Sequence, residues 1–182
     1  MRVMLDACVL YPTVMREVLL GCAKRGLFEP RWSVRILEEW ARAAGKLSGD
    51  QEVWARGEIA SLRAAFPEAN VGYDVALERQ YWLPDPADIH VLTAAVVGSC
   101  DGILTMNSKD FPKNILGDER LLRWDPDGFA LILIADAPKE VRSVAEGVLA
   151  EANRLSDTPW TMRALMKKAR MPRLGKALDT NS

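Results

Sequence analysis

The stretch LPDPADIHVLTAAVVGSCDGILTMNSKDFP, residues 83–112, carries the clearest structural pattern in the chain. Its two prolines predict an extended start, and Asp85 or Asp88 lies where a helix would begin. IHVLTAAVVG, residues 89–98, predicts a buried helix that ends at its final glycine. GILT, residues 102–105, predicts a short strand, and MNSKDFP forms the loop at its carboxyl end. The stretch therefore predicts one helix and one strand of a parallel sheet.

The sequence before this stretch shows the same alternation of strand and helix. The expected elements are a strand at 2–5, a helix between Thr13 and Gly26, a short strand within 27–32, a helix at 34–47 capped by Ser33, a helix at 51–65 and a short helix at 74–81. Such alternation indicates right-handed crossovers and a parallel sheet. The fold class predicted for residues 1–125 is therefore α/β.

After Asp125 the pattern changes to helices alone. They are expected at 129–135, 138–155 and 159–170, with Thr158 and Pro159 at the start of the last one. We therefore predict a helical C-terminal extension over residues 126–182.

The composition excludes several classes of protein. Nearly half of the 182 residues are hydrophobic and the net charge is −1, which indicates a globular core without a general attraction to nucleic acid or membranes. Three cysteines without metal-type spacing are interpreted as reduced core residues, and the single histidine, His90, argues against zinc sites and against most Ser-His mechanisms. There is no signal-peptide pattern, and the longest apolar run, at 129–135, is too short to span a bilayer. We expect a soluble, cytoplasmic protein.

Acidic and amide side chains follow the expected strands at the points where they end. Asp6 follows the first strand, Asn107 and Asp110 follow the strand at 102–105, and Asp88 begins the helix before it. Because ligands of parallel sheets bind beyond the carboxyl ends of the strands, we expect these groups on one rim. Their mutual repulsion would raise their pKa values unless a cation lay among them. A hard divalent ion such as Mg²⁺ suits such oxygen ligands and phosphate substrates.

At these residues the sequence resembles the PIN-domain family of ribonucleases, including toxins of the VapC kind. Over about residues 2–115 the resemblance is carried by LDACVLYP with Asp6, SVRILEEW with Glu39, DPADIHVLTAA with Asp88, and ILTMNSKDFP with Asn107 and Asp110. It implies a three-layer α/β/α fold with a central parallel sheet. It also implies an endoribonuclease that depends on Mg²⁺ or Mn²⁺, in which the four acids hold the metal. Cleavage would leave a 3′-hydroxyl and a 5′-phosphate.

The resemblance also implies partners. A protein of this kind would be the toxin of a toxin–antitoxin pair, held inactive by a small antitoxin protein that covers the acidic rim. A homodimer is expected, and the substrate would be RNA. Chains of this subgroup often carry a comparable helical extension.

Two positions of the site stay open. Many family members have Asp where this chain has Asn107, so either Asp110 carries the charge here or Asn107 only positions water. The apolar face of the helix at 34–47 centres midway between Glu38 and Glu39, so periodicity cannot choose between them, whereas the family pattern favours Glu39. One metal or two would fit the sequence equally.

Each candidate also has a purely structural interpretation. Asp6 and Asp88 would serve as helix caps, and Glu39 alone would be a solvated helix residue. Because these acids are all expected on one rim, the functional interpretation is favoured. Asp85 is interpreted as a solvated loop residue before Pro86, and His90 as a structural histidine.

Residues 163–176 contain six basic side chains and no acidic one. Such a segment is either a solvated helix face or a contact for the RNA backbone, with Lys167, Lys168 and Arg170 as the candidate contacts.

Two other functions are alternatives. A phosphatase of the haloacid dehalogenase type also places an Asp after its first strand, but it needs a second acid two residues later, where this chain has Cys8. The other alternative is a catalytically silent PIN fold used as a binding or scaffolding module, against which the intact acidic set argues.

Overall fold

The computed structural model describes residues 1–179 and divides the chain into two compact units. The first unit contains residues 1–11 and 29–124, and the second contains residues 12–28 and continues from Asp125. The division after Trp124 lies one residue from the predicted boundary. The helix after the first strand, however, groups with the C-terminal helices, whereas the prediction assigned it to the first domain.

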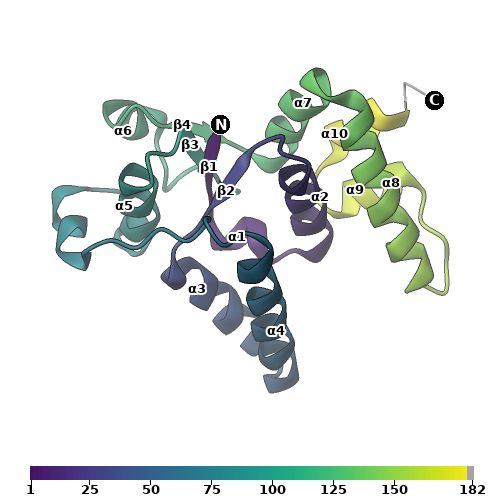
Figure 1. The fold of residues 1–182 in the computed structure, drawn as a ribbon, viewed down its shortest axis with the longest axis horizontal. Helices are drawn as coiled ribbons and strands as arrows, with labels where there is room; N and C mark the ends of the chain where they lie inside the picture. The colour runs from purple at the N-terminus through teal and green to yellow at the C-terminus, as the bar shows by residue number, and fades with distance from the viewer. Residues whose placement is uncertain (180–182) are drawn as a thin grey trace. The chain divides into compact units, whose positions relative to one another are not determined.

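The first unit is built on a parallel sheet of four strands (Figure 1). The strands are β1 (Arg2–Leu5), β2 (Glu29–Arg31), β3 (Gly102–Leu104) and β4 (Leu122–Trp124). They lie in the order β2-β1-β3-β4, and every neighbouring pair is parallel. Strand β1 is therefore central, and the direction of chain progression along the sheet reverses between β1 and β3.

The two inner strands are buried, as parallel strands covered by helices must be. Val3, Met4 and Leu5 of β1 and Ile103 and Leu104 of β3 are at most 1% exposed. Helix α5 (Ile89–Val97) contacts both strands, and most of its residues are buried. This helix follows the predicted span and ends before Gly98, as expected.

Helices flank the sheet of the first unit. In addition to α5 they are α1 (Ala7–Leu10), α3 (Val34–Gly45), α4 (Gly49–Ala65), the 3-10 helices η1 (Val75–Gln80) and η2 (Pro86–Asp88), and α6 (Lys113–Asp118). Ser33 caps α3 by accepting a hydrogen bond from the Ile36 backbone N–H, as predicted. Helices α3 and α4 pack against each other (Figure 1). The predicted α/β class with a central parallel sheet is confirmed.

Several short elements were not predicted, among them α1, α6, β4 and η2. Each has six residues or fewer, which is too short for hydrophobic periodicity to show in the sequence. Strand β4 is nevertheless important, because it extends the sheet beyond β3, with Ile103 opposite Arg123.

The second unit consists of helices. They are α2 (Thr13–Lys24), α7 (Pro126–Asp136), α8 (Pro138–Arg154), α9 (Met162–Lys168) and α10 (Pro172–Asp179). Helix α2 packs against α7, α8 and α9, which is the physical reason for its place in this unit. At its end Phe28 meets Phe129 of α7 edge to face, with ring centroids 5.1 Å apart.

A buried carboxylate fixes α10 to the start of α7. Asp127 is buried and accepts hydrogen bonds from the backbone N–H groups of Arg173 and Leu174, at 3.0 and 2.9 Å. The Arg173 guanidinium also pairs with Asp127 and Asp125. Since the buried charge has several donors, its desolvation cost is offset.

The prediction of one helix at 159–170 starting at Thr158 and Pro159 was wrong. Helix α9 begins at Met162, capped by Thr161, which accepts from the Ala164 backbone N–H at 3.2 Å. The Trp160 backbone N–H and carbonyl instead bond to the side chain of Asn153, which keeps this segment out of the helix.

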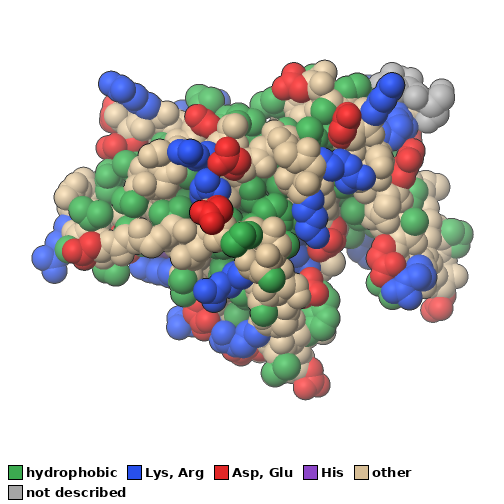
Figure 2. All heavy atoms as spheres, viewed as in Figure 1, with side chains coloured by type: hydrophobic (Ala, Val, Ile, Leu, Met, Phe, Trp, Pro, Cys, Tyr) green, Lys and Arg blue, Asp and Glu red, His purple; other side chains and the backbone are tan. Residues whose placement is uncertain are grey.

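None of the helices in residues 1–179 is long and apolar enough to cross a membrane. On the face shown in Figure 2, basic and acidic side chains are interspersed rather than gathered into one large patch.

Gly102→Ala should destabilise the protein by about 2 kcal/mol, because β3 leaves no room for a side chain at this position. A Cβ there would lie 2.4 Å from the Leu122 carbonyl oxygen and 2.5 Å from the Trp124 ring. The control is Gly57→Ala, an exposed position of α4 with nothing within 4 Å, which should gain up to about 1 kcal/mol. Urea unfolding measures both; equal stability of the Gly102→Ala variant and the wild type would contradict the prediction.

Candidate active site

The candidate site lies where the carboxyl ends of β1 and β3 meet. These strands are neighbours, and the Asp6 backbone N–H donates to the Leu104 carbonyl at 3.1 Å, so the two chain segments leave the sheet side by side. This is the point at which the strand order reverses, where open α/β sheets form their ligand crevice.

Asp6 is 7% exposed and stands at the N-cap position of α1, but its side chain makes no capping hydrogen bond. Its Oδ2 accepts from the Thr105 hydroxyl at 2.6 Å and from the Cys8 thiol at 3.0 Å. Its Oδ1 has no hydrogen-bond partner among the described residues. The structure thus places this carboxylate at the rim without a capping role.

Cys8 and Thr105 connect the rims of the two strands. The Met106 backbone N–H donates to Cys8 Sγ at 3.2 Å, and the Asn107 backbone N–H donates to Thr105 Oγ1 at 2.9 Å. Burial, together with the charge of Asp6, raises the pKa of Cys8 to about 12, so the thiol keeps its proton and donates to Asp6. Cys8, expected from the sequence to be only a core residue, thus contacts the candidate site, which no sequence pattern indicated.

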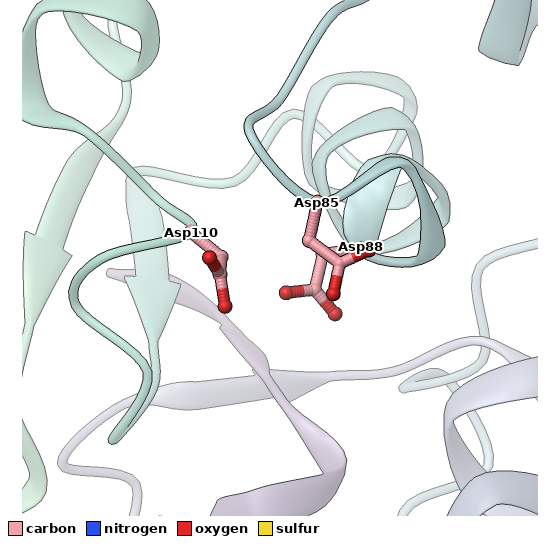
Figure 3. A group of neighbouring side chains, drawn as sticks. All are labelled: Asp85, Asp88 and Asp110. Carbon is pink, nitrogen blue, oxygen red and sulfur yellow. The ribbon is translucent and has the colours of Figure 1, made fainter.

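Three more carboxylates come together beside this rim. Asp85, Asp88 and Asp110 each offer an oxygen within 4.8 Å of the others. In Figure 3, Asp110 comes from the loop after β3 and faces Asp85 and Asp88, which come from the start of α5. The Asp88 side chain makes no capping hydrogen bond, although the residue is the N-cap of α5. Its carboxylate is therefore aimed at the cluster.

The interpretation of Asp85 as only a solvated loop residue does not hold. Asp85 is exposed, but its Oδ1 accepts from the Ala87 backbone N–H at 2.9 Å, and this cap of η2 turns the carboxylate toward Asp88 and Asp110. Its position depends on a single turn of 3-10 helix, which the Asp-Pro pair did not reveal.

Asn107 lies between two of the acids. Its amide Nδ2 donates to Asp88 Oδ2 at 3.3 Å and also to Asp110 Oδ2. An amide donor at this place brings two carboxylates together without neutralising either. The structure thus places Asn107 with Asp88 and Asp110, as the rim hypothesis expects.

Glu39 lies beside the site rather than in the cluster of three. Its Oε1 is 3.5 Å from Arg35 Nε and 2.9 Å from Nε2 of His90, although the latter contact lacks hydrogen-bond geometry. His90 is fully buried on α5, two residues after Asp88. The carboxylate of Glu38 instead pairs with Arg56, which lowers its pKa to about 2. Of the two glutamates, Glu39 is the one in contact with the helix that carries Asp88.

The electrostatics of the cluster favour a cation. Burial is the main cause that raises the pKa of Asp88 to about 6, followed by the charges of Asp6, Asp85 and Asp110. Within the described part of the chain, none of these four carboxylates has an ion pair with Lys or Arg. Clustered carboxylate oxygens without a basic partner are the donor set that Mg²⁺ and Mn²⁺ take. The residues present therefore fit a divalent ion.

Comparison with known proteins agrees with this geometry. A family model for the PIN domain matches residues 2–109, more than half of the chain. The chain belongs to the PIN domain family. The matched segment includes Asp6, Glu39, Asp88 and Asn107, and it ends one residue before Asp110. Neither a curated protein nor a solved structure matches the chain.

The PIN domain supplies a nuclease-type fold, and its members are generally nucleases that commonly use a divalent metal. In this chain the acidic cluster of Asp85, Asp88 and Asp110 could bind such an ion. The chemistry that the family supports is therefore hydrolysis.

The basic candidates Lys167, Lys168 and Arg170 lie in the second unit, at the end of α9, and all three are exposed. Lys168 Nζ lies over the Trp160 ring, 4.7 Å from its centroid. Their contact with RNA stays a prediction.

Without divalent ions, Asp88→Asn should raise the free energy of unfolding at pH 7 by about 1–2 kcal/mol. Folding raises the pKa of Asp88 from 3.8 to about 6, so the folded state binds this proton more tightly than the unfolded chain. Stability is therefore lost as the pH rises from about 4 through 6. The full shift corresponds to about 3 kcal/mol, which partial solvent exposure reduces.

Urea unfolding in EDTA from pH 4.5 to 7.5 measures this effect. Asp157→Asn removes the same charge from an exposed loop of the second unit and serves as the control. The prediction fails when wild type and Asp88→Asn show the same dependence of stability on pH.

Proposed function

We propose that this PIN domain is a metal-dependent endoribonuclease that hydrolyses RNA phosphodiesters. One observation carries the proposal: Asp6, Asp85, Asp88 and Asp110 gather at the ends of β1 and β3 with no basic residue paired to any of them in the described part of the chain. Such an arrangement is costly in an empty protein and becomes favourable when a cation is bound.

The residues divide into those that would hold the ion and those that orient them. Asp85, Asp88 and Asp110 offer oxygens close enough to share one ion, whereas Asp6 lies outside this group of three and is near enough for its charge to raise the pKa of Asp88. Glu39, which touches the same helix through His90, is a further ligand candidate. Thr105 and Cys8 fix the orientation of Asp6, and Asn107 fixes that of Asp88 and Asp110.

A bound Mg²⁺ or Mn²⁺ would lower the pKa of water and neutralise charge on the scissile phosphate. The acids then act as an oxygen cage, and hydrolysis would leave a 3′-hydroxyl and a 5′-phosphate.

The narrower biological role is also part of the proposal. We propose that the chain acts as a VapC-like toxin in the cytoplasm, as a homodimer, and is inhibited by a small protein that covers the acidic rim. The support is the resemblance of the four acid-bearing segments, together with a rim whose uncompensated negative charge would attract basic side chains of an inhibitor.

Asp88→Asn and Asp6→Asn should each lower the rate of RNA cleavage by about 100-fold or more, because each removes a charge that holds the ion. The assay uses end-labelled RNA with Mn²⁺ or Mg²⁺, and analysis of the product ends identifies the 5′-phosphate. Circular dichroism confirms that both variants fold.

The matched control is Asp101→Asn, which changes an acid at the opposite end of β3. Asp101 accepts from the Arg2 backbone N–H at 2.7 Å, and an asparagine oxygen keeps that bond. Full cleavage by the Asp6 and Asp88 variants, or by wild type in excess EDTA, would refute the metal-dependent mechanism. No cleavage by wild type with any divalent ion would favour the scaffold function.

Charge reversal of Lys167, Lys168 and Arg170 to Glu should weaken RNA binding and flatten its dependence on salt. Each lost phosphate contact lowers the slope of log affinity against log salt by about 0.7, so the triple variant should lose about 2. Binding is measured in the Asp88→Asn background, which avoids cleavage.

The control reverses Lys24, Lys46 and Lys139, which are also exposed. Equal slopes for the two triple variants would remove Lys167, Lys168 and Arg170 from the RNA interface.

A further inference from the structure

The loop that carries Asp110 is fixed to strand β4 by a side chain. Residues 108–110 form a turn, and among the described residues no backbone–backbone hydrogen bond of standard geometry involves residues 108–111. Instead, Nη1 of Arg123 donates to the carbonyl oxygens of Ser108 and Phe111, at 2.6 and 2.7 Å. One nitrogen therefore fixes the chain on both sides of Asp110.

Arg123 is placed for this by the sheet. It is the middle residue of β4, opposite Ile103 of β3, and the loop follows β3 directly. The Thr105 backbone N–H donates to the Trp124 carbonyl at 3.1 Å, which continues the ladder as far as the start of the loop. Beyond that point Arg123 provides the connection between β4 and the loop. Phe111, at the far end, is fully buried and anchors the loop in the core.

The choice of partners matters for the site. A guanidinium beside an acidic cluster ordinarily pairs with a carboxylate and occupies its oxygens. Over residues 1–179, Arg123 has no ion pair, and both of its hydrogen bonds go to carbonyls. Arg123 thus contacts the backbone on both sides of Asp110 without an ion pair to its carboxylate among the described residues.

We propose that Arg123 is a positioning residue of the metal centre. By holding the carbonyls of Ser108 and Phe111, it keeps Asp110 close enough to Asp85 and Asp88 for the three to share one ion. The proposal rests on the proposed function for the presence of that ion. Without Arg123, repulsion from the other acids would push Asp110 outward, since only the Asn107 amide and the buried neighbour Phe111 would oppose it.

The test measures binding of Mn²⁺ alone, without RNA, by the loss of the free-ion paramagnetic resonance signal. Arg123→Met keeps most of the side-chain volume and removes both hydrogen bonds. It should weaken Mn²⁺ affinity about tenfold or more, the usual effect of losing an outer residue that orients a ligand. Arg123→Lys keeps the charge and a donor and should recover part of the affinity.

Cleavage kinetics provide a second readout. In Arg123→Met the Mn²⁺ concentration for half-maximal rate should rise about tenfold, while kcat at saturating Mn²⁺ and KM for RNA stay near the wild-type values. If Arg123 had only a structural role, Arg123→Met would lower thermal stability without raising the Mn²⁺ concentration needed for half-maximal rate.

Arg31→Met is the matched control, because Arg31 is also a strand arginine that donates to a backbone carbonyl, that of Pro30. It should leave Mn²⁺ affinity unchanged. If Arg123→Met fails to fold, Arg123→Lys decides: weaker Mn²⁺ binding at wild-type stability supports the proposal, and wild-type binding overturns it.

The two proposals fail in different ways. Wild-type protein that binds Mn²⁺ no better than Asp88→Asn overturns the proposed function and the role of Arg123 with it. Wild-type binding that Asp88→Asn abolishes and Arg123→Met leaves unchanged overturns the role of Arg123 alone.

Discussion

The repulsion among carboxylates at the ends of β1 and β3 is the constraint on which the site depends. Asp85, Asp88 and Asp110 hold oxygens within 4.8 Å of one another, and the charge of Asp6 also raises the pKa of Asp88. Folding must supply the free energy that keeps them together. The side chains that donate hydrogen bonds to the carboxylates themselves are neutral: the Thr105 hydroxyl, the Cys8 thiol and the Asn107 amide. Because these donors carry no charge, the negative charge of the carboxylates remains available to bind a cation. The arrangement lowers the stability of the empty protein in favour of function.

The sheet order determines where those charges meet. Because β1 is central and lies beside β3, the residues after the two strands leave the sheet together, although they are far apart in the sequence. Gly102 lets β4 approach β3 closely, and β4 in turn carries Arg123 to the loop of Asp110. Packing at the edge of the sheet and geometry at the acidic cluster are therefore coupled, so a change in one is transmitted to the other through a single strand.

Local patterns predicted the parts of the fold that local forces determine. The Ser33 cap, the buried helix that ends before Gly98 and the strand after it follow from propensity and burial alone. The rule that ligands lie beyond strand ends was enough to bring Asp88, Asn107 and Asp110 together, since it requires only the ends of the strands. The place of Asp85 in the acidic cluster could not be predicted, because the direction of its side chain depends on a three-residue turn. Periodicity could not choose Glu39 over Glu38, and the family pattern that favoured Glu39 does not show its contact with His90, which depends on how two helices pack.

Tertiary contacts also decide what the basic C-terminal segment can do. The cations of this segment lie close together in the sequence, but in the folded protein they make different contacts. Arg173 is committed to Asp125 and the buried Asp127, where it fixes α10 to α7, so it is a structural residue. Lys168 lies over Trp160 and keeps an exposed ammonium. A count of charges therefore overstates the surface available to a phosphate backbone, because Arg173 is already engaged by two carboxylates.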